Sequence, residues 1–541
     1  MTRLIVLGLD SATFDLIIPW VNEGRLPNFE KLLATSAWGS LVSTLPPITA
    51  VAWNSFATGK NPGKHGVFDF VARAENSYQV SLVNGGQRRA EPYWRMLDNV
   101  GIAAGVVNMP MTYPPDQLEN GFMISGFDAP GTNANFAYPE SLKPILKKNN
   151  YVISPLAKSR KEWVEKLSQS FEVQEKTFFE LMEQRPWNLL TMVFMQLDVV
   201  HHLFWREMDE QDPIFGEVIL NMYQRVDEML GRLLGSLDHN TNLMIVSDHG
   251  AGHLKKAVSI NQWLWEKQLL HFRETKARYR VVSQFTERSF GWMKRSLPDT
   301  LKSWVKSRFG WLRDKAETAL TLGEFDWEKT KAFSVGEYGG VFINVAGREP
   351  HGSVQQSEYE KVRDEIIDGL QTLRDPVDGA TIVRKVWRRE ELYTGSQVSS
   401  APDLILEWDF AYDCHERAGG GQDSVFSDNI QYQVFANYRK TGVHRRDGII
   451  ILHGEPIKPG RMSSHQLVDA TSTLLYLLEQ PIPDDFDGQL IYEAIKPYYL
   501  RQHAPQTRPA DSWSGQQSMD KLSSEEEEAL AEKLKALGYL D

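Results

Sequence analysis

The sequence predicts an α/β protein with a mostly parallel central sheet that is covered by helices on both faces. Short apolar runs alternate along the chain with longer segments of helical periodicity, a pattern typical of βα units. Three of the apolar runs, residues 4–9, 190–197 and 243–247, are each followed by an aspartate. Since ligands bind at the carboxyl ends of parallel strands, the same runs indicate where a functional site would lie.

The expected elements follow one another in the order of a layered α/β core. Runs of four to eight apolar residues between polar segments are typical of buried strands, whereas longer periodic segments indicate helices. We expect strands at residues 3–9, 103–108, 121–125, 190–197, 242–247, 340–345, 402–407 and 448–452. We expect helices at residues 25–35, 50–58, 161–184, 215–236, 355–372 and 465–478.

The composition limits the class of protein. A chain of 541 residues with 42% hydrophobic residues can bury a large core. Its net charge of -12 argues against general nucleic-acid binding, which depends on phosphate neutralisation. Cys414 is the single cysteine, so an intramolecular disulfide and a thiolate metal cluster are excluded. The first apolar run is too short for a signal peptide and no run approaches the ~18 residues of a membrane span, so we expect a cytoplasmic protein.

Charge and polarity divide the chain into a core and two additions. We expect a discontinuous core at residues 1–270 and 325–495, with residues 271–324 inserted as a basic helical cap. Residues 271–320 hold twelve Lys and Arg against five Asp and Glu. A basic amphipathic segment with tryptophans at 290–315 is typical of peripheral contact with an anionic membrane. The alternative is a cap that packs on the core and keeps its basic face in water.

The C-terminal region is predicted to be a linker followed by one helix. Residues 496–522 are expected to be the linker, because 502–519 are rich in Pro, Gln and Ser. In the helix expected within 523–541, Ser524 and Glu527 fit a capping box and Gly538 would end it. The apolar residues Leu530, Leu534 and Leu537 would dock on the body or on another subunit of a homo-oligomer.

Three aspartates and two histidines indicate a metal site. Asp10, Asp198 and Asp248 follow the three apolar runs, His202 lies four residues after Asp198, and His249 comes directly after Asp248. Mixed Asp and His ligation suits zinc or manganese better than magnesium or calcium, which prefer oxygen ligands alone. Residues 198 and 202 would share a helical face only if a helix starts there, and an ordinary surface pair would have the same spacing.

Thr49 is the candidate nucleophile. It follows the pair Pro46-Pro47, and a helix is expected to start at or after it. A hydroxyl at a helix start faces unpaired N–H groups that favour an anion such as phosphate. Taken alone, the simplest interpretation of Thr49 is a helix N-cap.

These motifs together resemble the phosphodiesterase and nucleotide pyrophosphatase branch of the alkaline phosphatase superfamily. The resemblance spans residues 1 to about 495 and is greatest to a group of predicted phosphohydrolases or phosphomutases. It implies a three-layer α/β/α alkaline-phosphatase-like core. The motifs that carry it are Gly8-Leu9-Asp10, Thr49, Thr58-Gly59, Pro62, His65-Gly66, Asp198 to His202, Ser247-Asp248-His249-Gly250 and Gly442-Val443-His444.

The resemblance implies roles for seven residues around two divalent metal ions, zinc first and manganese second. One metal would be held by Asp10, Thr49, Asp248 and His249, and the other by Asp198, His202 and His444. Two cations at this spacing stabilise the attacking and leaving oxygens of a displacement at phosphorus, and coordination activates the Thr49 hydroxyl.

Alternatives remain open for some of these residues. His201 is the rival of His202, and His415, His453 and His465 are substitutes for His444. His65 is better explained as a residue that holds a turn than as a ligand. Lys64 would either contact substrate phosphate or be an ordinary solvated lysine.

Three functions remain from the sequence. The leading one is a metal-dependent hydrolase of a small-molecule phosphate ester, a phosphodiesterase or phosphatase, with Thr49 as the nucleophile. A phosphomutase or phosphoryl transferase could use the same site if a cap excludes water. A catalytically silent binding protein is the third. Where related nucleotide pyrophosphatases carry an asparagine this chain has Val67-Phe68-Asp69-Phe70, so a nucleotide substrate is not implied.

Overall fold

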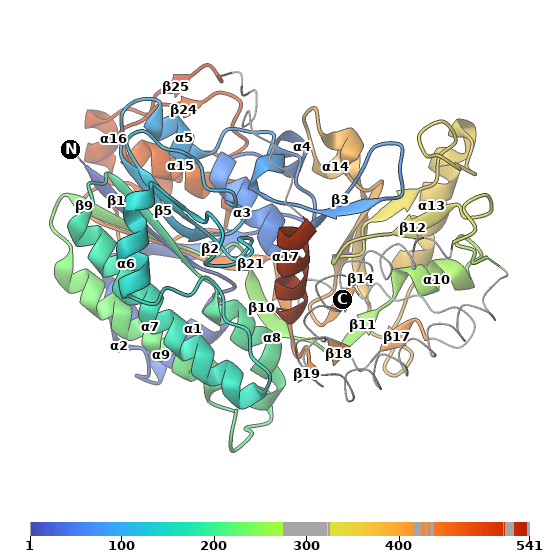
Figure 1. Ribbon diagram of the computed structural model, residues 1–541, viewed down its shortest axis with the longest axis horizontal. Helices are drawn as coiled ribbons and strands as arrows, with labels where there is room; N and C mark the ends of the chain where they lie inside the picture. The colour runs from blue at the N-terminus through green and yellow to red at the C-terminus, as the bar shows by residue number, and fades with distance from the viewer. Residues whose placement is uncertain are drawn as a thin grey trace.

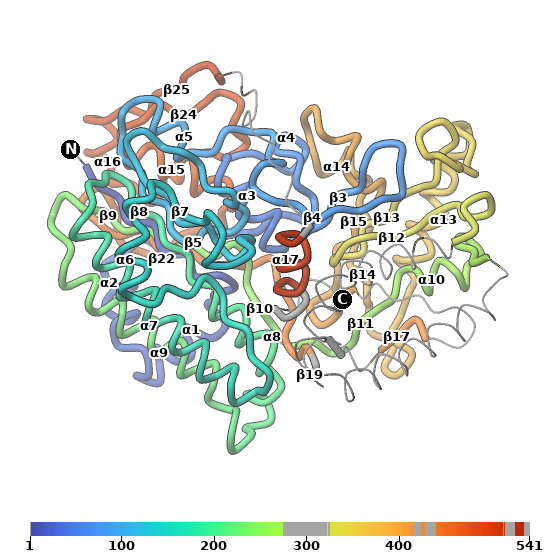
Figure 2. The backbone as a smooth tube through the Cα atoms, viewed as in Figure 1, coloured from blue at the N-terminus to red at the C-terminus, as the bar shows by residue number. Residues whose placement is uncertain are grey.

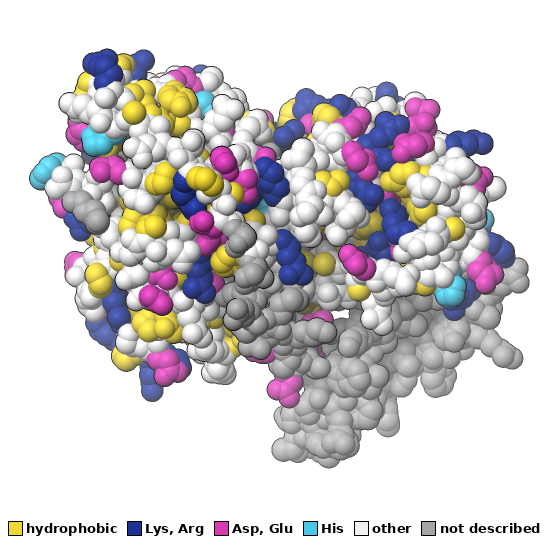
Figure 3. Space-filling model, turned by 90° about the horizontal axis from the view of Figure 1, so that it is seen from above, with side chains coloured by type: hydrophobic (Ala, Val, Ile, Leu, Met, Phe, Trp, Pro, Cys, Tyr) yellow, Lys and Arg dark blue, Asp and Glu magenta, His cyan; other side chains and the backbone are white. Residues whose placement is uncertain are grey.

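The computed structural model describes residues 2–273, 322, 325–414, 424–427, 431–432, 438–511, 513 and 524–537, and the basic insertion predicted at 271–324 lies almost wholly outside them. The described residues form two lobes, a larger one around a central sheet and a smaller one built mainly from residues 256–272 and 325–427 (Figure 1). Lys, Arg, Asp and Glu side chains are interspersed over both lobes on the face seen in Figure 3.

The main sheet has ten strands and is mostly parallel. β1, β8, β9, β5, β6 and β2 run in one direction, while β21 and β7 run in the other. In order across the sheet the strands are β22 (Gly460–Arg461), β2 (Ala37–Val42), β21 (Asp447–His453), β9 (Thr241–Val246), β1 (Arg3–Leu9), β8 (Leu189–Phe194), β5 (Ala104–Met109), β6 (Phe122–Ser125) and β7 (Ala137–Tyr138), and β23 (His465–Gln466) pairs with β2. The predicted fold class is confirmed.

Helices cover both faces of this sheet because each presents an apolar stripe to it. On one face lie α1 (Phe14–Asn22), α2 (Pro27–Thr35), α7 (Arg160–Gln184), α8 (Gln196–Asp209) and α9 (Val218–Ser236) (Figure 1). On the other lie α3 (Thr49–Thr58), α5 (Tyr93–Asp98), α15 (Leu467–Leu477) and, beyond them, α4 (Pro62–His65) and α16 (Pro497–Gln502) (Figure 1). α6 (Lys143–Lys148) follows β7 in the chain.

The second lobe has its own antiparallel sheet and its own core. Its four strands, in spatial order, are β12 (Ala332–Ser334), β13 (Val341–Ile343), β15 (Leu404–Trp408) and β14 (Val383–Arg388). They pack with α10 (Ile260–Glu266), α13 (Tyr359–Gln371) and α14 (Arg389–Leu392), and with a small sheet of β11 (Lys256–Val258), β16 (Tyr412–Cys414) and β17 (Phe426–Ser427) (Figure 2).

Short ribbons complete the described elements. β10 (Gly250–His253) pairs with β20 (Gly442–Arg445), β3 (Val71–Arg73) with β4 (Val80–Leu82), β18 (Gln431–Tyr432) with β19 (Tyr438–Arg439), and β24 (Ile482–Pro483) with β25 (Thr507–Arg508). Among the described residues, 3-10 turns lie at Gly85–Gln87, Glu140–Leu142, Gln356–Glu358, Val398–Ser400 and Tyr492–Ala494. No helix in the described part of the chain is both long and apolar enough to cross a membrane.

Two of the predicted strands belong to a different sheet from the one expected. Residues 340–345 and 402–407 were expected within the layered core, but β13 and β15 form the antiparallel sheet of the second lobe. A short apolar run indicates a buried strand without indicating its partner, because only the tertiary fold decides which strands pair.

The chain after residue 496 is more ordered than the predicted linker. Residues 497–502 form α16, and β25 pairs with β24. Tyr499 is buried and contacts the rings of Tyr476 and His503, which fixes this stretch to the main lobe. This stretch has no apolar periodicity in the sequence, because it is held by single contacts with distant residues such as that of Tyr499 with Tyr476.

The C-terminal helix α17 (Ser524–Leu537) packs on the body of the same chain. Leu530 and Leu534 are buried, and Tyr113 donates a hydrogen bond of 2.6 Å to Glu526 Oε1. Lys533 donates to the carbonyl of Ala129. Burial lowers the pKa of Lys533 to about 8. The side chains of Ser524 and Leu537, and all of Gly538, lie outside the described residues.

Candidate active site

The seven predicted residues come together at the carboxyl edge of the main sheet. Asp10 follows β1 directly, Asp248 and His249 follow β9, Asp198 and His202 lie on α8 just after β8, and His444 lies on β20. Thr49 is the first residue of α3. None of the seven side chains is more than 5% exposed. Residues from five distant segments therefore form one buried polar cluster.

The first half of the cluster contains Asp10, Asp248, His249 and Thr49. His249 Nε2 lies 3.2 Å from Asp248 Oδ2 and 3.9 Å from Asp10 Oδ1. The Thr49 hydroxyl oxygen lies 3.4 Å from the same nitrogen. Asp10, Asp248 and His249 offer ligand atoms that all lie within 4.8 Å of one another. Ligands that are each about 2 Å from one ion have this mutual spacing.

The second half contains Asp198, His202 and His444. Asp198 Oδ1 lies 3.4 Å from His202 Nε2 and 3.2 Å from His444 Nε2. The two histidine Nε2 atoms are 2.9 Å apart. Asp198, His249 and His444 also satisfy the mutual distance of 4.8 Å, so His249 lies within reach of both halves. The two groups of potential ligands therefore share His249, and His202 lies beside the second group without belonging to it.

Two histidines are oriented by backbone carbonyls. His202 Nδ1 lies 3.0 Å from the carbonyl of Gly442, and His249 Nδ1 lies 3.1 Å from the carbonyl of Gly250. A carbonyl only accepts a hydrogen bond, so each Nδ1 carries the proton and each Nε2 lone pair faces the cluster. Burial lowers the pKa of His202 to about 3 and that of His249 well below its usual value, so both rings are neutral. This orientation is typical of histidines that bind a metal.

The carboxylates need a compensating positive charge. Burial, and then repulsion from Asp248 and Asp198, raises the pKa of Asp10. Burial, and then repulsion from Asp198, raises the pKa of Asp248. In the described part of the chain, Asp10 Oδ1 and Asp248 Oδ2 are buried and accept no hydrogen bond. Cations at the cluster would satisfy both oxygens, so the residues present fit a divalent metal site.

Thr49 is not a helix cap, contrary to its simplest interpretation. Ile48 occupies the N-cap position of α3, and Thr49 is the first helical residue, with its hydroxyl toward His249. All ten residues of α3 are buried, so the helix holds Thr49 rigidly. α3 ends at Gly59, whose φ of 66° is in the left-handed region and whose Cβ position would collide with Phe486.

The structure also distinguishes His202 from His201. α8 begins at Gln196, so residues 198 and 202 lie one turn apart on the same face. The strand predicted at 190–197 ends at Phe194 in the structure, and Asp198 lies in the first turn of α8. His201 points elsewhere, with Nδ1 3.2 Å from Ser11 Oγ.

The other candidate residues make contacts that involve none of the seven. Lys64 donates to Asp487 Oδ1 at 2.6 Å and to the carbonyl of Asp485 at 2.7 Å. His453 Nδ1 lies 3.1 Å from Ser36 Oγ, and His465 Nε2 lies 2.6 Å from Glu493 Oε1. His415 lies outside the described residues.

His65 holds a turn, as predicted. Its Nε2 lies 2.8 Å from Ser55 Oγ, and its Nδ1 accepts a hydrogen bond of 3.2 Å from the backbone of Val67. Burial, and then the charge of Arg88, lowers the pKa of His65 to about 3. The ring is therefore neutral, and both of its nitrogens are engaged within the main lobe.

Sequence reasoning missed the residues that support the cluster. Trp53 Nε1 donates a hydrogen bond of 2.7 Å to Asp10 Oδ2, and the backbone N–H of Ser11 donates one of 3.3 Å to Asp248 Oδ1. Ser11 has a φ of 67°, which is uncommon for a residue other than glycine. Trp53 lies four residues after Thr49, and residues at this spacing share a face of a helix. This spacing was the one feature of the sequence that could have indicated that Trp53 lies near the site.

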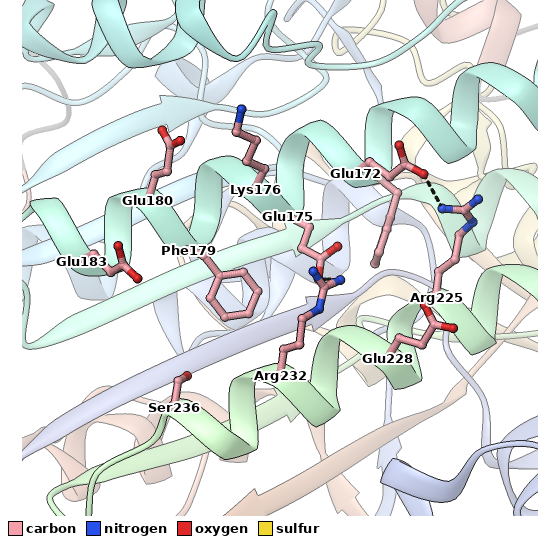
Figure 4. Close-up of a pocket in the computed structure, with 11 residues that line it drawn as sticks. Glu172, Glu175, Lys176, Phe179, Glu180, Glu183, Arg225, Glu228, Arg232 and Ser236 are labelled. Atoms are coloured by element: carbon pink, nitrogen blue, oxygen red, sulfur yellow. Dashed lines mark hydrogen bonds and ion pairs between the residues drawn. The ribbon is translucent and has the colours of Figure 1, made fainter.

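A cavity of about 640 Å³ lies away from this cluster (Figure 4). It is formed between α7 and α9, and Glu172 pairs with Arg225 across it at 2.8 Å. Its lining contains none of the seven residues. Ion pairs between the two helices line this cavity, and we interpret it as a groove on the surface of the main lobe.

The fold and cluster define an α/β protein with a buried Asp, His and Thr site at the carboxyl edge of its main sheet. The chain belongs to the type I phosphodiesterase and nucleotide pyrophosphatase family, whose model matches residues 4–444. That family supports phosphoric ester hydrolysis as the general activity. No curated protein sequence matches the chain.

A solved structure with a TM-score above 0.5 shows the same fold at low sequence identity. Phosphonoacetate hydrolase from Sinorhizobium meliloti, in complex with phosphonoformate, is 14% identical with a TM-score of 0.54, covering 88% of this chain and 95% of that one. Murine ectonucleotide pyrophosphatase/phosphodiesterase 5 is 13% identical with a TM-score of 0.49, covering 93% of this chain and 100% of that one.

Proposed function

We propose that this protein is a metal-dependent phosphoric ester hydrolase that uses Thr49 as its nucleophile. The observation that carries the proposal is His249 Nε2, which lies 3.4 Å from the Thr49 hydroxyl and belongs to both groups of potential metal ligands. A nucleophile held beside two adjacent ligand groups is the arrangement that displacement at phosphorus requires.

Asp10, Asp248, His249 and Thr49 would hold one divalent cation, and Asp198, His202 and His444 the other. Zinc suits this mixture of carboxylate and neutral imidazole, and manganese is the alternative to be tested. The cations would lower the pKa of the threonine hydroxyl and stabilise charge on the attacking and leaving oxygens.

The chain's own residues supply orientation and water exclusion. Trp53 holds Asp10, Ser11 holds Asp248, and the buried helix α3 aims the hydroxyl of Thr49. The Thr49 oxygen would bond to phosphorus as the ester oxygen leaves on the opposite side with the alcohol. Water would then hydrolyse the phospho-threonine, releasing phosphate or its monoester and restoring the hydroxyl.

The first test is hydrolysis of bis-p-nitrophenyl phosphate and p-nitrophenyl phosphate by protein that is stripped of metal and then reloaded with zinc or manganese. We expect activity only after reloading, and the ratio of the two rates will assign diester or monoester chemistry. Equal activity of the stripped and reloaded protein would contradict the role of metal.

The role of Thr49 is tested by Thr49→Ala and Thr49→Ser. We expect Thr49→Ala to lose at least about 10³-fold in kcat, whereas Thr49→Ser keeps a hydroxyl and retains part of the activity. Mass spectrometry of acid-quenched wild-type protein should find a phosphoryl group on the peptide that contains Thr49. Full activity of Thr49→Ala with unchanged metal content would show that water attacks directly.

The metal ligands are tested by His444→Asn, with His465→Asn as the matched control. His465 pairs with Glu493 at the surface and contacts none of the seven residues. Metal analysis should find less bound metal in His444→Asn and the wild-type amount in His465→Asn. The same loss in both variants would point to unfolding rather than to a lost ligand.

A further inference from the structure

A second cavity, of about 160 Å³, borders the candidate active site between the two lobes. From the main lobe it is lined by Val42 at the end of β2, by the loop residue Pro47, and by His444 and the three residues that follow it. His444 is one of the seven cluster residues, and Pro47 lies two residues before Thr49. The cavity therefore adjoins a predicted ligand and is lined by the loop that leads to the predicted nucleophile.

The wall contributed by the second lobe is aromatic. It contains Tyr338, Trp408 and Phe410. Phe410 is 44% exposed, which is unusual for a large apolar side chain on this molecule. Two guanidinium groups lie over its ring, with the Cζ atoms of Arg384 and Arg445 at 4.5 Å and 5.6 Å from the ring centroid. This wall offers flat surfaces on which a planar group could stack.

Three acidic residues of the lining are already engaged in hydrogen bonds. Glu407 accepts from the indole N–H of Trp387, Asp409 accepts from the backbone of Phe410, and Asp447 accepts from the hydroxyl of Ser40. Acidic and basic residues are equal in number in the lining, so the net charge of the cavity does not show what it binds. The hydrogen-bonding groups that have no protein partner are more informative.

Arg445 and Arg446 each have one donor unused among the described residues, although Nη2 of Arg446 donates a hydrogen bond of 3.3 Å to the carbonyl of Ser43. In the described part of the chain, the Nε atoms of Arg445 and Arg446 are buried and make no hydrogen bond. The nearest acidic oxygen to Arg445 belongs to Asp15, at 3.6 Å, and the nearest to Arg446 belongs to Glu407, at 3.5 Å. Both distances exceed a normal hydrogen bond. Guanidinium groups that line the cavity and lie this far from the nearest carboxylates can still pair with an anionic ligand.

We propose that this cavity binds the leaving-group half of the substrate, and that it selects a small planar group that carries an anionic substituent such as a carboxylate. This inference rests on the proposed hydrolysis at the adjoining cluster. The volume corresponds to roughly five water molecules at about 30 Å³ each, so a single ring fits and a long polymer does not. Arginine pairs with carboxylates through planar, two-point hydrogen bonding and stacks on aromatic faces.

The test compares two substrates whose leaving groups differ by one carboxylate, p-nitrophenyl phosphate and m-carboxy-p-nitrophenyl phosphate. For the metal-loaded wild type we expect kcat/KM to be about tenfold higher for the carboxylated ester, equivalent to one good charged hydrogen bond. Arg384→Gln and Arg445→Gln should bring this ratio close to one. Arg374→Gln, an exposed arginine outside the cavity, should leave the ratio at its wild-type value.

Arg384→Gln is the decisive variant because Arg384 lies on β14 of the second lobe and is exposed, so its loss does not disturb the metal ligands. Metal content is measured for each variant to exclude damage through His444. A ratio near one in the wild type, or a ratio unchanged in both cavity variants, would overturn the proposal.

A failure of the proposed function can be separated from a failure of this inference. If neither ester is hydrolysed by metal-loaded protein, the hydrolase proposal fails, and the cavity is tested by binding alone. Titration with m-carboxy-p-nitrophenol and p-nitrophenol should then show about tenfold tighter binding of the carboxylated phenol, lost in Arg384→Gln. Equal binding of the two phenols would overturn the inference.

Discussion

The two lobes contribute different chemistry to the candidate site. The main lobe supplies acidic and imidazole side chains from the ends of buried parallel strands, where backbone geometry brings distant residues together. The second lobe supplies aromatic and basic side chains from an antiparallel sheet and its loops. They belong to Tyr338, Arg384, Trp408 and Phe410. Under the proposals above, the main lobe would carry out the reaction and the second lobe would select the substrate.

The lobes are joined at the nucleophile. Leu45, Ile48 and Val51, which flank Thr49 in sequence, belong to the hydrophobic core of the second lobe. The hydroxyl of Tyr393 donates a hydrogen bond of 2.6 Å to the carbonyl of Leu45. The helix that carries Thr49 thus packs on one lobe along its length and is anchored by the other at its start.

The largest effect is expected from Asp248→Asn in the main lobe. It removes the charge of a proposed metal ligand. Because the metal site would serve every substrate, we expect at least about 10³-fold loss of kcat/KM for all esters, with loss of bound metal. Asp209→Asn, an exposed pair with His253, is the control. Loss of activity toward only one class of ester would break the distinction between the lobes.

Trp53→Phe should have the next largest effect. It removes the N–H donor to Asp10 and leaves an aromatic ring in place, so we expect about 10-fold to 100-fold weaker metal binding. Trp94→Phe is a close control, because Trp94 also donates from a buried indole at 2.7 Å to a carboxylate, that of Asp116. Metal titrations that find equal affinities for the two variants would contradict a supporting role for Trp53.

Tyr393→Phe tests the connection between the lobes. It leaves the carbonyl of Leu45 without its donor, at a cost of about 1–3 kcal/mol in the free energy of unfolding. We expect kcat to fall while KM changes little, since the loop before Thr49 loses its support. Tyr476→Phe removes a comparable bond to the carbonyl of His503 and should change stability without changing kcat.

The pH dependence of the stability that metal binding adds to the protein is expected to be a smaller effect. In metal-free protein the pKa values of Asp10 and Asp248 lie above the ordinary 3.8, so the folded state binds more protons than the unfolded state. Their contribution to stability is therefore present at low pH and is lost as pH rises above about 4 toward the raised values. The gain in Tm on metal loading should grow from about pH 5 to pH 8. A gain that shrinks with pH would contradict this.

The smallest effect is expected from Phe410→Leu in the second lobe. It removes the ring over which Arg384 and Arg445 lie, worth about 0.5–1 kcal/mol, so preference for the carboxylated ester should fall about two- to fivefold. Activity toward p-nitrophenyl phosphate should change little. An equal loss for both esters would show that the second lobe affects the reaction itself.

Strands and helices of the main lobe were predictable because their apolar runs and periodicities are local properties of the chain. β1, β5, β6, β8 and β9 all lie within a few residues of the expected ranges. The assignment of β13 and β15 to a separate sheet was not predictable, since pairing depends on contacts between distant segments.

The candidate site residues could be recognised without the fold because they stand in local motifs, namely Asp10, Thr49, Asp198, His202, Asp248, His249 and His444. How these residues meet depends on the packing of distant segments. The phase of α8 turned His202 toward Asp198 and His201 toward Ser11, and packing on α3 put Trp53 against Asp10. The cavity lined by Arg384 and Arg445 exists only because two lobes meet, and such contacts between distant segments leave no local pattern in a sequence.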